Sequence, residues 1–137
     1  MTTQLTLTVL PLEFSICRLF PSEAVPSRVL AASFYSITRT SDELSIVCPT
    51  ECVPEGVHCD SGWRNVKIEG PLDFSLTGVL KSLADPLAEA GISIFAVSTY
   101  ETDYLLVKEF DLDRAVAALS NAGHLVSECA DAPGRDL

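Results

Sequence analysis

The chain has 137 residues, 47% of them hydrophobic and 20% charged. This composition supplies enough apolar material for one domain, or for two very small ones, and it excludes the disordered and fibrous classes. Nine Lys and Arg against 19 Asp and Glu give a net charge of −10, which argues against binding to a nucleic-acid backbone or to an anionic membrane surface.

The first half of the chain predicts mostly strands. Leu5, Leu7 and Val9 alternate with threonine, which indicates a half-buried strand over residues 4–10 that Pro11 ends. The same reasoning places the other elements of this half: strands at 14–19, 34–38 and 44–48, a short helix near 27–32, and a loop over 49–62 with room for one helical turn.

The second half has a clearer order of elements. Apolar spacing predicts strands at 63–69, 92–97, 104–107 and 124–126, and helices at 76–90 and 111–123. Strand, helix, strand, strand, helix, strand is the order of a ferredoxin-like fold, in which two helices cover one face of an antiparallel sheet. The first half is similar to a reduced version of the same fold.

We therefore predict an α+β protein of two ferredoxin-like (βαββαβ) modules in tandem. The first module spans 1–62, the second spans 63–128, and 129–137 form a C-terminal tail. The sequence leaves open which strand completes which module, because the end strands could exchange between the two.

Cysteines and the chain start bear on the compartment. The five cysteines are an odd number, and Met1-Thr2-Thr3-Gln4 lacks the basic start of a signal peptide, so we expect reduced thiols and a cytoplasmic protein. No apolar run approaches the ~20 residues of a membrane-spanning helix. Four residues lie close enough in sequence to be considered as zinc ligands: Cys48, Cys52, His58 and Cys59. Two adjacent ligands do not converge easily on one tetrahedral ion, so partly buried thiols in a loop are the favoured reading.

Catalytic motifs are missing from the sequence. It contains no G-x-S-x-G, no phosphate-binding P-loop and no H-E-x-x-H. His124 follows Gly123 at a strand entry and is expected to be a half-exposed edge residue, and a nucleophilic pair of His58 and Cys59 is less favoured than an ordinary loop. We predict no enzyme activity, no metal site and no cofactor.

Two polar segments interrupt the apolar pattern of the second half. Residues 70–79 join a strand to a helix, whose unpaired N–H groups can receive a carboxylate, and Gly78 would allow a ligand to approach the backbone. Residues 98–103 join two strands and carry hydroxyls, an aromatic ring and two carboxylates. On local chemistry alone, a helix cap and a hairpin turn remain the simpler explanations.

These segments carry a resemblance to a known family. The run Ile92-Ser93-Ile94-Phe95-Ala96-Val97-Ser98-Thr99-Tyr100-Glu101-Thr102-Asp103-Tyr104-Leu105-Leu106-Val107, preceded by Gly70-Pro71-Leu72-Asp73-Phe74 and Thr77-Gly78-Val79, resembles ACT domains. It is similar in particular to small bacterial ACT proteins related to the CASTOR family of cytosolic arginine sensors. The most specific feature is S-T-[YF]-x-x-D, and the likeness is strong over 63–123 and looser over 1–62.

The resemblance implies a regulatory role, because ACT domains bind small ligands, usually amino acids, and commonly pair side by side. It implies a ligand site made of two segments: the helix start with Thr77, Gly78, Val79 and Leu80, and the loop with Ser98, Thr99, Tyr100 and Asp103. The first would hold the carboxylate of an amino acid, and the second its amino group or side chain. The arginine sensors have four modules and this chain has two, so the same arrangement would need a homodimer.

The sequence thus predicts an allosteric sensor protein that binds an amino acid, forms a homodimer and is not a catalyst. It predicts no partnership with nucleic acid or membrane. The alternative is a protein–protein interaction or dimerisation module with a vestigial ligand site.

Overall fold

The computed structural model describes residues 4–70 and 78–129, and the structural statements below concern those residues. Contacts divide the chain into two compact units: unit 1 contains residues 1–11 and 64–137, and unit 2 contains residues 12–63. The sequence-based division at residue 62 assigned residues 1–11 to the first module. In the structure their contacts are with the second half of the chain.

Unit 1 is a mixed α+β fold. Its elements are the first part of β1 (Thr6–Leu19), the last part of β4 (His58–Ile68), α2 (Val79–Glu89), β5 (Ile94–Ser98), β6 (Asp103–Lys108), the short helix η2 (Glu109–Asp111), α3 (Leu112–Asn121) and β7 (Leu125–Glu128). Its strands lie in the order β7-β1-β4-β6-β5, and β1 and β7 pair in parallel. The sequence left open which strand completes which module; in unit 1, β1 lies between β4 and β7.

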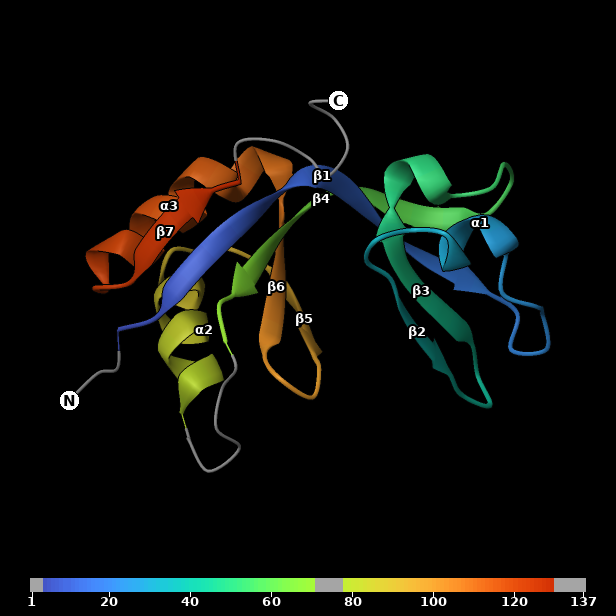
Figure 1. The fold of residues 1–137 in the computed structure, drawn as a ribbon, viewed down its shortest axis with the longest axis horizontal. Coiled ribbons are helices and arrows are strands. Elements are labelled where there is room, and N and C mark those ends of the chain that lie inside the picture. Colours follow the sequence, from blue (N-terminus) through green and yellow to red (C-terminus); the bar gives the residue numbers. More distant parts are fainter. Residues whose placement is uncertain (1–3, 71–77, 130–137) are drawn as a thin grey trace. The chain divides into compact units, whose positions relative to one another are not determined.

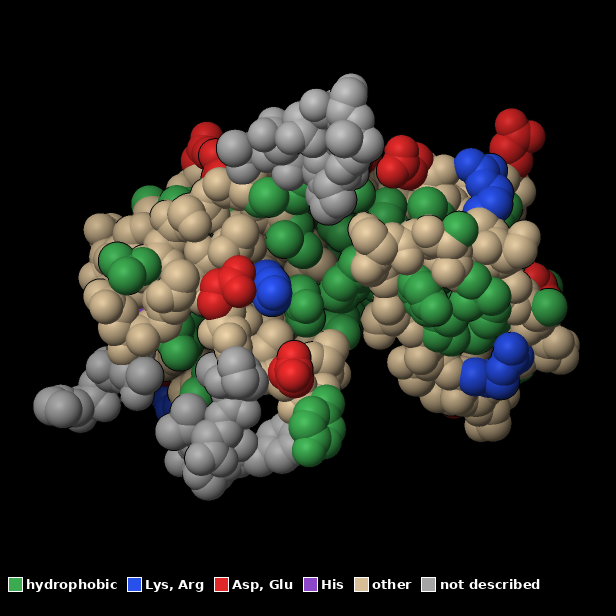
Figure 2. Space-filling model, viewed as in Figure 1, with side chains coloured by type: hydrophobic (Ala, Val, Ile, Leu, Met, Phe, Trp, Pro, Cys, Tyr) green, Lys and Arg blue, Asp and Glu red, His purple; other side chains and the backbone are tan. Residues whose placement is uncertain are grey.

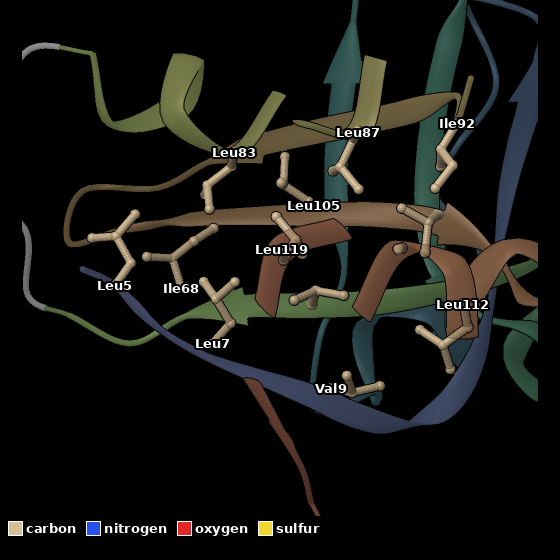
Figure 3. Close-up of a cluster of buried hydrophobic side chains, with 13 residues drawn as sticks. Leu5, Leu7, Val9, Ile68, Leu83, Leu87, Ile92, Leu105, Leu112 and Leu119 are labelled. Carbon is tan, nitrogen blue, oxygen red and sulfur yellow. The ribbon is translucent and has the colours of Figure 1, made fainter. Parts of the chain in front are cut away.

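The core of unit 1 explains this insertion. Leu5, Leu7 and Val9 are at most 6% exposed and pack into the same cluster as the helices. In Figure 3, Leu83 and Leu87 of α2 and Leu119 of α3 point toward the side chains of the sheet. Both helices therefore bury their apolar stripes on one face of the sheet, as their spacing predicted. The N-terminal strand adds three fully or nearly fully buried side chains to that face.

Pro11 does not end the first strand, contrary to the prediction. β1 continues through it to Leu19, but its pairing changes there. Residues 6–9 pair with β7, and residues 14–19 pair with β3 (Leu44–Pro49). Pro11 lies between these two registers, where its missing N–H removes no bond from either ladder.

Unit 2 contains the second part of β1, α1 (Ser27–Leu30), β2 (Ser36–Arg39), β3, the short helix η1 (Thr50–Cys52) and the beginning of β4. β2 and β3 correspond to the strands predicted at 34–38 and 44–48 and pair antiparallel with each other, and β3 also pairs antiparallel with β1. The predicted loop over 49–62 ends earlier, because β4 begins at His58. The start of this strand could not be predicted, because residues 58–62 lack the alternation of apolar and polar residues that indicates a strand. Gly62 also has a positive φ of 84°, which is unusual within a strand.

Polar side chains also bind unit 2 together. The Ser15 hydroxyl is fully buried and forms hydrogen bonds with the Thr50 and Ser61 hydroxyls, at 2.9 and 2.7 Å. The Glu13 carboxylate accepts from the Thr50 hydroxyl and from the Gly62 N–H. These bonds join β1, η1 and β4 and satisfy polar atoms that would otherwise be costly to bury.

Candidate functional site

The loop between β5 and β6 is a tight, hydrogen-bonded turn. The Thr99 N–H donates to the Thr102 carbonyl at 2.8 Å, and the Thr99 hydroxyl donates to the same oxygen at 3.0 Å. The Thr102 N–H in turn donates to the Thr99 hydroxyl at 3.3 Å. Two threonines thus close the turn from both sides and leave Tyr100 and Glu101 at its tip.

A buried hydrogen bond anchors this turn to the sheet. Thr102 is 7% exposed, and its hydroxyl donates to the carbonyl oxygen of Ile68 at 2.6 Å. Ile68 is the last residue of β4 and is itself fully buried. The hairpin tip is therefore fixed beside the point where the chain leaves β4 toward α2.

The start of α2 is the second predicted segment. Gly78 precedes the helix with φ of 78°, a conformation that strains any residue with a Cβ, and it supplies no side-chain cap. The first intrahelical bond runs from the Ser82 N–H to the Gly78 carbonyl at 2.9 Å. The amides of Val79 and Leu80 belong to the helix start and have no intrahelical partner. Thr77 lies outside the described residues.

His124 connects the first turn of α2 to the sheet. The Leu5 N–H donates to its Nδ1 at 3.2 Å, and its Nε2 lies 3.3 Å from the Ser82 carbonyl. Since Nδ1 accepts, Nε2 carries the proton and donates to Ser82. The ring is 3% exposed, so the expectation of a half-exposed edge residue is wrong. Its two hydrogen-bond partners lie 119 and 42 residues away in sequence, so no local sequence pattern could have predicted its burial.

The two predicted segments thus lie at the same end of unit 1. The N-terminal segment that His124 contacts at Leu5 is also bonded to the end of β4: the Glu69 N–H donates to the carbonyl of the next residue, Thr6, at 2.8 Å. The bond from Thr102 to Ile68 then reaches the hairpin. In Figure 1 the start of α2, the end of β4 and the β5–β6 turn are seen at this end.

The predicted loop residues differ in exposure. Ser98 and Thr99 are exposed, and Tyr100 is 83% exposed. Asp103 is half-buried at the first position of β6, where it pairs in register with Ser98, and its carboxylate has no hydrogen-bond or ion-pair partner among the described residues. The end of unit 1 therefore offers helix-start amides and an uncompensated carboxylate, which suit opposite charges of one small molecule.

The candidate zinc residues do not form a metal centre. Within residues 4–70 and 78–129, no group of three or more His, Cys, Asp or Glu side chains is placed to hold a metal ion. Cys48 and Cys52 instead join Cys17 and Cys59 in the hydrophobic core of unit 2, and His58 is exposed. The hydrogen bond between the Cys17 and Cys48 thiols raises the pKa of Cys17 and lowers the pKa of Cys48.

Charge distribution and helix length bear on the expectation that the chain has no nucleic-acid or membrane partner. On the face drawn in Figure 2, Lys and Arg side chains lie in small separate groups and not in one basic surface. Of the helices in the described residues, none is long and apolar enough to cross a membrane.

Two family models match the chain. A model described as "ACT domain" matches residues 58–121, and a model of an N-terminal domain matches residues 13–56. The first match covers the hairpin loop and the start of α2.

Two human proteins are among the sequence relatives of the chain. The human protein CASTOR3P is 33% identical over 101 residues, which are 64% of this chain and 62% of that protein. The human "Cytosolic arginine sensor for mTORC1 subunit 1" is 30% identical over 116 residues, which cover 74% of this chain and 35% of the sensor. The chain thus spans less than two thirds of the length of these curated relatives.

A solved structure matches nearly the whole chain. Protein Atu0741 from Agobacterium tumefaciens is 41% identical, with a TM-score of 0.90, and the match covers 96% of this chain and 98% of that one.

Replacing Thr102 tests whether its hydroxyl anchors the hairpin. Thr102→Val keeps the shape of the side chain but leaves the buried Ile68 carbonyl without its donor, so we expect unfolding free energy to fall by about 1–2 kcal/mol in urea titrations. Thr38→Val is the matched control, because Thr38 is exposed on β2. Equal midpoints for the two variants would contradict the anchoring role.

Proposed function

Because the chain is an ACT-domain protein related to the cytosolic arginine sensors, we propose that it is a regulatory protein that binds a free amino acid and has no catalytic activity of its own. The observation that carries this proposal is the set of buried hydrogen bonds, through His124 and Thr102, that holds the α2 start and the β5–β6 loop at one end of unit 1. A site for a bifunctional ligand needs two such segments at a fixed separation.

The two segments suit the two charged groups of an amino acid. The amides of Gly78, Val79 and Leu80, with Thr77 beside them in sequence, would hold the carboxylate at the positive end of the α2 dipole. Asp103 would accept a charge-assisted hydrogen bond from the ammonium group or from a cationic side chain. Tyr100, Ser98 and Thr99 would line the site. The net charge of −10 favours cationic ligands modestly at low salt.

We further propose a two-module organisation in the cytoplasm. In sequence order the modules are 1–62 and 63–128, followed by a tail at 129–137, with residues 1–11 contributing a strand to the sheet of the second module. The separate family matches in the two halves support the proposal, and so does the existence of two compact units. The free thiols of Cys17, Cys48, Cys52 and Cys59 suit a reducing compartment.

A homodimer would complete the site. The arginine sensors named above are longer than this chain, which spans 35% of the human protein. A second copy would supply the modules that a longer chain carries in itself, and closed twofold dimers are the commonest solution for such pairing.

The second candidate function is an interaction module without a working ligand site. It is favoured by large apolar side chains that unit 1 exposes, above all Tyr100 at 83% and Phe110 at 81%. Exposed aromatic residues are typical of surfaces that bind other proteins.

Ligand-dependent melting separates the two candidates. A ligand at about 100 times its Kd stabilises the folded state by about 2.7 kcal/mol. For a chain of this size we expect a rise in Tm of about 5 °C or more with at least one of the twenty amino acids. Asp103→Asn should remove most of that rise, because it deletes the charge that faces the ammonium group.

Glu101→Gln is the matched control, since it neutralises an exposed carboxylate two residues away in the same turn. It should leave the ligand-induced rise unchanged. If both variants keep the full rise, Asp103 is not a ligand contact. If no amino acid raises the Tm at millimolar concentration, the amino-acid proposal fails and the interaction module takes its place.

The dimer is tested by light scattering. At about 50 μM, far above the Kd of a micromolar dimer, the measured mass should be about twice the 14.7 kDa of one chain. A mass of one chain, with or without the stabilising amino acid, would overturn the proposal that a second copy completes the site.

A further inference from the structure

Unit 2 contains a cavity that is separate from the end of unit 1 described above. Its volume is about 310 Å³, at the lower end of the range for small-molecule sites. It lies where β1 ends, with Leu19 and Phe20 in its lining, and the other walls come from the turns that carry Glu23, Asp42 and Gly56. Every lining residue belongs to unit 2.

Hydrogen bonds hold the first wall of this cavity in place. The Glu23 N–H donates to the Phe20 carbonyl at 3.0 Å, which closes the turn after β1. From β2, the Arg39 guanidinium donates to the carbonyls of Pro21 and Glu23. The turn therefore has bonds within itself and to a neighbouring strand.

The two other walls are also closed turns. In the β2–β3 turn the Thr40 hydroxyl accepts from the N–H groups of Asp42 and Glu43, both at 3.1 Å, and the Thr40 N–H donates to the Glu43 carbonyl. Before β4, the Val57 N–H donates to the Pro54 carbonyl at 3.4 Å. A cavity whose walls are already fixed spends little conformational entropy when a ligand enters.

The cavity lining is rich in ionisable groups that have no visible partner. Arg18, Glu23, Asp42 and His58 all line it. Among the residues that the structure describes, none of these four side chains forms a hydrogen bond or an ion pair. Phe20 adds a ring that is 75% exposed. Unpaired charges of both signs beside an aromatic surface are what a small ligand with both charges would contact.

We propose that this cavity is a second small-molecule site, specific for small zwitterions that are neutral or carry one net positive charge. Arg18, with an N–H of His58, binds the carboxylate. Glu23 and Asp42 bind the cationic end, and Phe20 covers the stem between them. The two carboxylates of Glu23 and Asp42 outnumber the guanidinium of Arg18 in the lining, so an acidic zwitterion is disfavoured.

The test uses amide NMR spectra of the full chain, titrated with lysine, glycine and glutamate at fixed pH and salt. The amides of Gly56 and Val57 should shift, with affinity falling from lysine through glycine to glutamate. Arg18→Gln should weaken the binding of all three about tenfold, since it removes a charged hydrogen bond to the carboxylate. Neutralising Glu23 and Asp42 together should abolish the preference for lysine over glutamate.

Glu55→Gln is the control, because this exposed carboxylate precedes Gly56 in the same turn but does not line the cavity. It should leave all three affinities unchanged, and the spectra themselves report whether each variant is folded. Absence of shifts at Gly56 and Val57 up to about 20 mM of each amino acid overturns the proposal, as does unchanged affinity in Arg18→Gln. Shifts confined to residues 98–103 would also overturn it while leaving the proposed function intact. Shifts confined to the unit 2 cavity would support it even if the site in unit 1 fails.

Discussion

One buried hydrogen bond determines the geometry of the end of unit 1 that carries the candidate site: the Thr102 hydroxyl donates to the carbonyl of Ile68. Without it, the β5–β6 turn would lose its hydrogen bond to the end of β4. With it, the turn is fixed to β4 at the residue where the sheet ends. His124 performs the same task on the other side, where it joins α2 to the N-terminal strand through both ring nitrogens. Loops that carry function are useful when a rigid scaffold positions them, and here the scaffold reaches the loops through buried side chains.

Much of this fold could be predicted from sequence because its signals are local. The spacing of Leu112, Ala115 and Leu119 identifies α3, and all three are buried as predicted. The alternation of Leu5, Leu7 and Val9 identifies a half-buried strand. The spacing of apolar residues along the chain fixes which side chains share one face of a helix or strand. A single sequence is therefore enough to predict which residues of such an element are buried. The α+β class with two helices on one sheet face followed from these periods alone.

The errors have a common physical origin in contacts between residues far apart in sequence. Pro11 was expected to end a strand. The missing N–H of proline disrupts a strand only where that N–H would bond a neighbouring strand, and the sequence does not show which strand lies beside Pro11. The sequence also left open which strands complete unit 1, because β1 pairs there with β7, over a hundred residues later in the chain. Thr102 lies inside the recognised motif, yet its role depends on Ile68, 34 residues earlier. The residues of the candidate ligand loop were identified by resemblance, and their local chemistry alone favoured an ordinary turn.

We propose that the α2 start and the β5–β6 turn act as one site. An amide NMR titration with whichever amino acid stabilises the protein most, following Gly78, Val79, Leu80 and Asp103, tests this proposal. All four amides should shift along one saturation curve with a single Kd, because one molecule would contact both segments. Shifts in only one segment, or two curves with different midpoints, would contradict it.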